Sequence, residues 1–170
     1  MYLSDVDILK ELKMGKIRIE PFDKKRLGPA SYDLSLSETF YLPRKVRGEV
    51  EAREDTNPHK YMRKVKRKEV LLEPGEYCLA LTREKITLSS DIIGLLGGRS
   101  RFARMGLTVH ITSAVVQPGS DNHQILEIVN LSPFDIRLFA GERISQIFFQ
   151  YLKSPTSQPY RKFGRLARKQ

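Results

Sequence analysis

Apolar and polar residues along the chain form short runs that predict β-strands. Turn-forming pairs such as Pro74-Gly75, Pro118-Gly119 and Ala140-Gly141 separate many of these runs. Many short strands between regular turns indicate a mainly β protein, either a sandwich or a barrel. The predicted strands cover residues 17–20, 32–36, 38–42, 70–72, 77–83, 92–96, 107–112, 125–130, 135–139 and 144–151.

One helix is predicted at the start of the chain, over residues 4–16. Ser4 or Asp5 can cap its first turn, and Gly15 suits its end. The positions that recur at helical spacing are Val6, Leu9, Leu12 and Lys13. The fold expected from these patterns is therefore a β-sandwich or barrel preceded by a short N-terminal helix.

Two segments lack a core-forming pattern. Residues 43–68 are charged and poor in apolar side chains, which predicts a long exposed loop or ribbon. Residues 155–170 contain Pro, Ser, Gly and basic residues without a clear period, which predicts a flexible basic tail. We therefore expect one domain, residues 1–154, followed by that tail.

Composition narrows the possible partners. The chain has 170 residues and a formal net charge of +10, which favours anionic ligands such as nucleotides, nucleic acid or acidic surfaces. No apolar run is long enough for a membrane span, and the first residues do not resemble a secretory signal, so we expect a cytoplasmic protein without membrane contact. The single cysteine, Cys78, permits no internal disulfide, and we expect it to be a small buried hydrophobe.

The segment from Gly98 to Arg104 has the composition of a phosphate-binding turn. Glycines allow the backbone to approach a ligand closely, and successive backbone N–H groups can hold phosphate oxygens. The planar guanidinium groups of Arg99 and Arg101 can also donate paired hydrogen bonds to phosphate oxygens. The residues alone leave a second interpretation open, a charged surface loop.

Glu127 is a lone carboxylate within an apolar predicted strand. Leu126 and Ile128 share one face of that strand, while Glu127 shares the other with Ile125 and Val129. Burying a carboxylate is costly, so Glu127 either faces solvent or lies in a pocket with a raised pKa. The second interpretation makes it a partly buried carboxylate suited to proton transfer.

Motifs along nearly the whole chain resemble the dCTP deaminase family, in the superfamily that it shares with trimeric dUTPases. The matching segments occur in the family's order and spacing. They are residues 17–22, 29–36, 98–100, 103–107, 109–112, 118–119, 126–130 and 140–146. The resemblance implies a distorted β-barrel of the dUTPase-like (β-clip) type, assembled as a homotrimer with active sites between subunits.

The resemblance also implies a role for each matched residue. Glu127 falls on the catalytic glutamate, and Ser100 and Arg104 fall on residues that position water and that glutamate. Triphosphate contacts are implied for Arg99 and Gln146, and Arg101, Tyr160 and Lys162 are further candidates. The implied base and sugar pocket, formed largely by backbone, includes His110, Thr112, Ser113, Val115 and Gln117.

The implied ligands are dCTP and dUTP, with Mg²⁺ bound through the triphosphate and with dTTP as a possible inhibitor. Zinc deaminases hold their metal with a histidine or cysteine and a cysteine pair, whereas this chain has one cysteine and three scattered histidines. We therefore expect zinc-independent deamination of dCTP to dUTP and ammonia. The family's tail closes over the triphosphate, and we expect the basic tail here to do the same.

Departures from the family keep two alternatives open. Gln117 precedes Pro118-Gly119 where the superfamily usually has an aspartate that activates water for pyrophosphate release, and an amide cannot act as that base. Ser113 to Val115 also differ from the family, so a dUTP diphosphatase or a bifunctional deaminase–diphosphatase remains the first alternative. The second is a non-catalytic member that binds nucleotides or nucleic acid. Nucleic acid is the less expected ligand, because only Tyr61 lies within the basic cluster near residue 64.

Overall fold

The computed structural model describes residues 1–162 and contains the predicted N-terminal helix, α1 (Asp5–Lys13). Ser4 caps it, because its side chain accepts a hydrogen bond from the Asp7 N–H while the Asp7 carboxylate accepts one from the Ser4 N–H. The expected buried face was wrong in part: Ile8 is fully buried, whereas Val6 is 69% exposed. The helix is therefore turned so that Ile8 meets the sheet.

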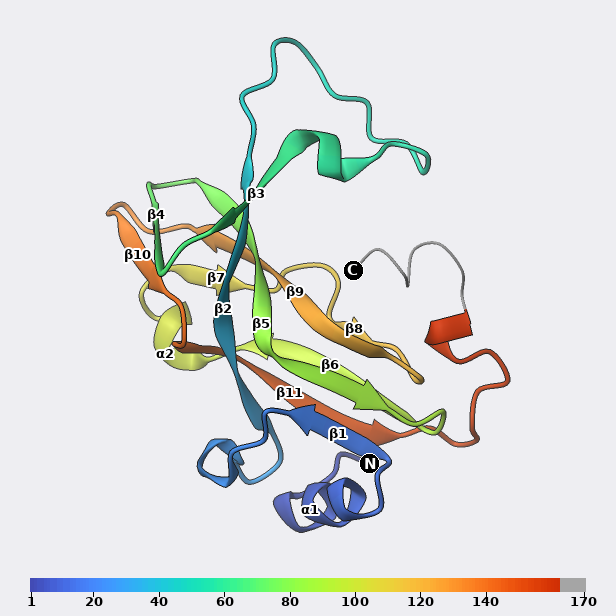
Figure 1. Cartoon of the computed structure of the whole chain (residues 1–170). Helices are drawn as coiled ribbons and strands as arrows, with labels where there is room; N and C mark the ends of the chain where they lie inside the picture. Colours follow the sequence, from blue (N-terminus) through green and yellow to red (C-terminus); the bar gives the residue numbers. More distant parts are fainter. Residues whose placement is uncertain (163–170) are drawn as a thin grey trace.

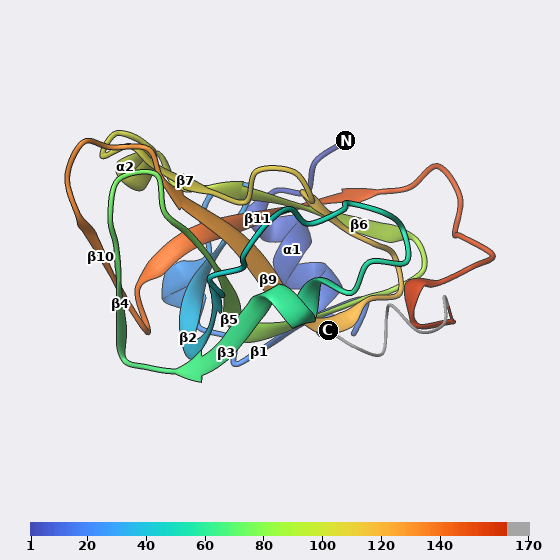
Figure 2. The same ribbon diagram turned by 90° about the horizontal axis from the view of Figure 1, so that it is seen from above.

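The strands form one large antiparallel sheet and a small two-stranded one (Figures 1 and 2). In the large sheet the hydrogen-bonded order is β7-β9-β5-β2-β11-β6-β8, with β1 added on β5 and β3 on β2; β10 pairs with β4. The strands are β1 (Ile17–Glu20), β2 (Tyr32–Pro43), β3 (Met62–Lys66), β4 (Glu69–Leu72), β5 (Tyr77–Leu88), β6 (Ile92–Gly98), β7 (Leu107–Val109), β8 (Val115–Val116), β9 (Asp121–Asn130), β10 (Ile136–Phe139) and β11 (Arg143–Tyr151).

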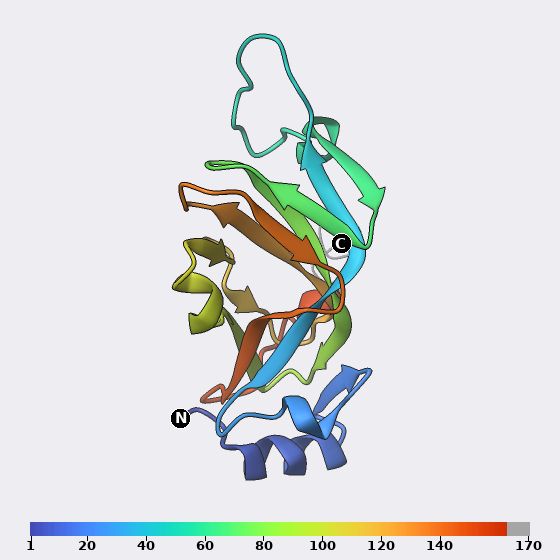
Figure 3. The same ribbon diagram turned by 90° about the vertical axis from the view of Figure 1, so that its left-hand side faces the viewer.

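The large sheet curls into a distorted half-barrel, as predicted (Figure 3). Its two outermost strands in the pairing order, β7 and β8, are separated along the chain only by residues 110–114. A segment this short can connect opposite ends of the strand order only if the sheet bends back on itself. Residues 110–114 therefore lie where the two ends of the curled sheet approach each other.

The interior of the curl is filled by side chains from alternate strand positions. Tyr32, Phe40, Ile147 and Phe149 are fully buried there. Cys78 is also fully buried, which confirms the expectation for the lone cysteine, and burial raises the pKa of its thiol to about 12. The thiol is therefore protonated and packs as a hydrophobe.

A buried carboxylate that was not predicted from the sequence faces this interior. Glu84 on β5 is fully buried, in phase with the core-facing residues of its strand. Its carboxylate forms an ion pair with Arg26 and accepts hydrogen bonds from the N–H and the hydroxyl of Ser35 at 2.8 and 2.7 Å. The ion pair and both hydrogen bonds offset the cost of burying the charge.

Several strand limits differ from the expected ones for identifiable reasons. The two strands predicted over residues 32–42 form one strand, β2. The strand predicted over residues 107–112 stops at Val109, because His110 has a φ of 63° and cannot continue an extended strand. The short strand β8 was not predicted. Within the charged segment, residues 44–61 form the expected exposed ribbon, with a 3-10 helix at Pro58–Tyr61 (Figure 1).

The described part of the tail follows the surface of the same chain. The Thr156 N–H donates to the Ser90 carbonyl at 2.8 Å, and a 3-10 helix forms over Tyr160–Lys162. Residues 163–170 lie outside the described residues. Within residues 1–162, no helix has the length and apolar character needed to cross a bilayer.

Candidate active site

Glu127 lies on β9 with its side chain on the face away from the core. Leu126 and Ile128, its neighbours in sequence, are fully buried, whereas Glu127 is half-buried. Its partner across the antiparallel pairing with β5 is Leu79. The pleat of β9 therefore places the carboxylate outside the packed interior but beside apolar groups.

Residues 110–112 supply the hydrogen bonds to the Glu127 carboxylate. The Ile111 and Thr112 N–H groups donate to Oε2 at 3.1 and 2.8 Å, and the Thr112 hydroxyl donates to Oε1 at 2.9 Å. The left-handed backbone at His110 turns the chain so that these donors face the carboxylate. The His110 N–H also donates to the Glu127 carbonyl at 2.6 Å, which fixes the start of the turn.

These contacts determine the ionisation of Glu127. Burial raises the pKa of the carboxyl, but the hydrogen bonds from Thr112 and Ile111 favour the ionised form, and the net result is a lowered pKa. The expectation that a pocket would raise this pKa was therefore wrong. The carboxylate is held ionised and can accept a proton at neutral pH.

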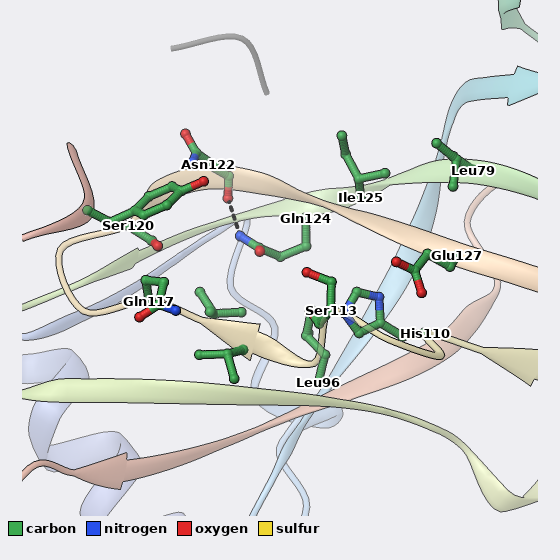
Figure 4. Close-up of a pocket in the computed structure, with 13 residues that line it drawn as sticks. Leu79, Leu96, His110, Ser113, Gln117, Ser120, Asn122, Gln124, Ile125 and Glu127 are labelled. Atoms are coloured by element: carbon green, nitrogen blue, oxygen red, sulfur yellow. Dashed lines mark hydrogen bonds between the residues drawn. The ribbon is translucent and has the colours of Figure 1, made fainter. Parts of the chain in front are cut away.

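Glu127 lines a pocket of about 360 Å³ between β9, β8 and the segment 110–117 (Figure 4). Five residues that the sequence indicated for the site line it with Glu127, namely His110, Ser113, Val115, Gln117 and Tyr160. Thr112 is absent from the lining and acts on the site through its hydrogen bonds to Glu127. The Nε2 atom of His110 contacts the Ser113 carbonyl, so the two residues form a tight corner of the pocket.

Sequence reasoning missed the polar residues of β9 that face the same pocket. Asn122 and Gln124 line it together with Ser120, and the Gln124 amide donates to the Asn122 carbonyl at 3.0 Å (Figure 4). They were missed because the strand predicted over residues 125–130 begins only after them, whereas β9 starts at Asp121. The other lining residues are Leu79, Leu96, Val116 and Ile125. A pocket that combines amides, hydroxyls and one carboxylate with apolar side chains suits a ligand with a flat ring that carries polar atoms.

The arginine-rich turn forms a second hollow, separate from the Glu127 pocket. Ser100 begins the short helix α2 (Ser100–Ala103), and Arg99, Ser100, Arg101 and Arg104 line a cavity of about 400 Å³. Neither Ser100 nor Arg104 lines the pocket of Glu127. Within one chain, the structure therefore does not bring Ser100 and Arg104 together with Glu127.

Two residues expected to contact phosphate, Arg99 at this hollow and Gln146 on β11, are held by neighbouring residues. The Arg99 guanidinium lies 3.3 Å from the Asp33 carboxylate and donates to the Arg143 carbonyl at 2.8 Å. The Gln146 amide donates to the Gly98 carbonyl and accepts from the Ser31 hydroxyl, both at 3.2 Å. These contacts fix the orientation of both side chains before any ligand arrives.

The tail contributes Tyr160 but not Lys162 to the pocket lining. The Tyr160 N–H donates to the Pro118 carbonyl at 2.9 Å. Gly119 has a φ of 79°, and a Cβ there would lie 2.4 Å from the Pro159 Cβ. Close backbone packing at Gly119 therefore positions Tyr160. Among the described residues, no three or more His, Cys, Asp or Glu side chains gather as a metal site would require.

The curled antiparallel sheet is the dUTPase-like β fold, which the solved structures described below share. Residues 2–152 match the model of the family described as dCTP deaminase-like, and the chain belongs to that family. A dCTP deaminase, dUMP-forming, from Methanosphaera stadtmanae is 34% identical over 93% of this chain and 83% of that protein. A dCTP deaminase from Thermomicrobium roseum is 38% identical over 95% and 85%.

Solved structures agree on the fold. The 2'-deoxycytidine 5'-triphosphate deaminase from Agrobacterium tumefaciens superposes with a TM-score of 0.67 at 24% identity, covering 89% of this chain and 48% of that one. The present chain thus spans about half the length of that solved chain. The dUTPase of Staphylococcus bacteriophage 80alpha superposes with a TM-score of 0.53 at 16% identity, covering 82% of this chain.

Proposed function

We propose that this protein deaminates dCTP to dUTP and ammonia without zinc. The observation that carries the proposal is the ionised Glu127 carboxylate in a pocket lined by amides and hydroxyls. Membership of the dCTP deaminase-like family supports it, as do relatives of similar length that are named dCTP deaminases. Deoxycytidine triphosphate also carries the negative charge expected of a ligand for a chain of net charge +10.

The proposed reaction needs one group that moves protons, and Glu127 serves as that group. Its carboxylate takes a proton from water as the oxygen bonds to C4 of cytosine, and N3 receives this proton. Glu127 then takes the proton of the new C4 hydroxyl and passes it to the amino group. The C4–N bond breaks, ammonia leaves and a C4 carbonyl remains, so the atoms of dCTP and water balance those of dUTP and ammonia.

The separation of the two hollows supports a site shared between subunits. Ser100 and Arg104, proposed to position the water and Glu127, lie in a different hollow of the same chain. A homotrimer in which this hollow of one copy faces the pocket of its neighbour would unite them. Exposed apolar side chains favour association, since Leu131, Phe134 and Phe139 are 69%, 53% and 49% exposed.

The same arrangement is proposed to bind the triphosphate. Arg99 and Arg101 are proposed to offer guanidinium groups to phosphate oxygens, and Gln146, whose amide donates to the Gly98 carbonyl, lies on β11 as a further contact. Tyr160 and Lys162 of the tail are proposed to close over the phosphates. Mg²⁺ would enter with the nucleotide, bound through phosphate oxygens rather than through a set of protein ligands.

We propose on the basis of Gln117 that dUTP is released rather than cleaved. An amide has no basic form with which to activate water for pyrophosphate release. Asp121 does not replace the missing carboxylate, because it pairs with Lys85 at 2.9 Å and accepts from the Thr87 hydroxyl at 2.6 Å, and it is absent from the pocket lining. The second candidate function is formation of dUMP, which the names of several relatives favour.

Assays of ammonia and pyrophosphate with dCTP and dUTP, each with Mg²⁺, distinguish these functions. The proposal expects ammonia from dCTP and no pyrophosphate from either nucleotide. Pyrophosphate together with ammonia from dCTP would establish the bifunctional reaction, and pyrophosphate from dUTP without ammonia would establish a dUTP diphosphatase. Absence of both products, with nucleotide binding retained, would indicate a non-catalytic member.

A further inference from the structure

A basic ribbon runs beside β2 as part of the large sheet, next to the projecting segment 44–57 (Figure 1). It consists of β3 and the residues on either side of it, 60–68, and is called the basic ribbon below. Six of these nine residues are cations and none is acidic: Lys60, Arg63, Lys64, Lys66, Arg67 and Lys68. All six are exposed.

The positive charge of the basic ribbon is not neutralised by its surroundings. Within residues 1–162, none of the six cations forms an ion pair with an acidic side chain. The adjoining segment, residues 44–57, contains four acidic and four basic residues and is neutral as a whole. Glu69, the next acid along the chain, pairs with Arg137 at 2.7 Å. The ribbon therefore presents a concentrated positive surface to an anionic partner.

Besides Tyr61 of the ribbon itself, the structure adds a second aromatic ring, from a strand distant in the sequence. Tyr41 on β2 lies opposite Lys64 in the antiparallel pairing with β3. The Lys64 ammonium is 5.8 Å from the centre of the Tyr41 ring. Tyr41, His59, Met62 and Lys64 line a hollow of about 380 Å³. An aromatic ring at the wall of a hollow, beside cations, offers a stacking surface for a base.

We propose that the basic ribbon binds single-stranded nucleic acid. Lys64 and Lys66 are alternate residues on one face of β3, about 6.6 Å apart, and contact neighbouring phosphates; Arg67, directly after the strand, contacts a third. One base enters the hollow and stacks on Tyr41, from which the Lys64 ammonium moves to a phosphate. A duplex fits less well because its bases are already stacked on one another.

The test measures the affinity of a fluorescently labelled 20-nucleotide oligo-dT by anisotropy, at several salt concentrations. The matched duplex and vesicles containing phosphatidylserine are measured alongside. We expect the single strand to bind most tightly. With three phosphates neutralised, the logarithm of affinity should fall against the logarithm of salt with a slope of about −2.

Two variants of equal charge separate a defined surface from general attraction. Lys64→Gln/Lys66→Gln/Arg67→Gln should weaken binding at least about tenfold. The control, Lys13→Gln/Lys24→Gln/Lys25→Gln, removes the same charge from exposed residues elsewhere and should change affinity by less than about twofold.

A third variant tests stacking. Tyr41→Leu keeps apolar bulk on β2 and should weaken binding of the single strand at least about fivefold, with the salt slope unchanged. Equal losses in the two triple variants, or no binding at all, would overturn the proposal. So would tighter binding of the duplex or of the vesicles. Melting temperatures and ammonia release from dCTP should stay unchanged in the triple variants, so the result is independent of the deaminase proposal.

Discussion

Glu127→Gln tests the central role proposed for the carboxylate while nearly preserving its shape. The change removes the group that accepts and returns protons. It also alters the contacts with residues 110–112, because a carboxylate accepts from the Ile111 and Thr112 N–H groups and the Thr112 hydroxyl together. A glutamine has one acceptor oxygen, and its NH₂ group would face one of these donors.

The expected magnitudes follow from these two losses. General acid–base catalysis contributes roughly 100- to 10,000-fold, so the barrier should rise by about 3 to 5 kcal/mol. Loss of one charge-assisted hydrogen bond at a half-buried site should lower the free energy of unfolding by about 1 to 2 kcal/mol. For a chain of this size that corresponds to a melting temperature lower by about 2 to 8 °C.

Ammonia release from dCTP measures the first effect and thermal unfolding the second. Glu73→Gln serves as the matched control, because it removes the same charge from an exposed position outside the pocket. Turnover of the control should equal that of the parent protein. If Glu127→Gln retained turnover within tenfold of the parent, Glu127 could not be the proton-transfer group.

Three further changes test the geometry around this site and in the core. Thr112→Val removes the hydroxyl that favours ionised Glu127, so the pKa of that carboxyl should rise; since the base works only above its pKa, the acid limb of a kcat–pH profile should move to higher pH. Gly119→Ala adds a Cβ that would clash with Pro159 in a left-handed conformation; a several-fold higher KM for dCTP and about 1–3 kcal/mol lower stability are expected from kinetics and urea unfolding. Glu84→Gln leaves a buried partner unpaired and should cost about 3–5 kcal/mol in urea unfolding, whereas a loss below 1 kcal/mol would contradict the buried ion pair.

Much of the fold follows from periodicity that the sequence displays. The capping signal at Ser4 and the alternation along β1, β9 and β11 fix those elements, because local burial decides which residues face inward. The exposed position of Val6 depends on how α1 docks against the sheet, which no local pattern specifies. Burial of Glu84 could not be predicted from its neighbours in sequence either, because its ion-pair partner Arg26 is 58 residues away.

The site was foreseeable in its chemistry but not in its arrangement. Glu127 stood out as a carboxylate in an apolar strand, and the structure places it in a pocket. Its lowered pKa comes from donors in residues 111–112, whose direction depends on the unusual backbone at His110. The distance of Ser100 and Arg104 from that pocket is a property of tertiary structure, since resemblance to a family assigns roles without saying which copy of the chain fulfils them.

The segment 110–114 is both the connection between the two ends of the curled sheet and the source of the hydrogen bonds to Glu127. The length and conformation of this one segment consequently determine both how the sheet closes and how the Glu127 carboxylate is oriented. An insertion in residues 110–114 would move the two ends of the sheet apart and would also remove the hydrogen bonds that hold Glu127. An insertion in residues 44–57 would do neither. Variation in length should therefore be tolerated in residues 44–57 and not in residues 110–114.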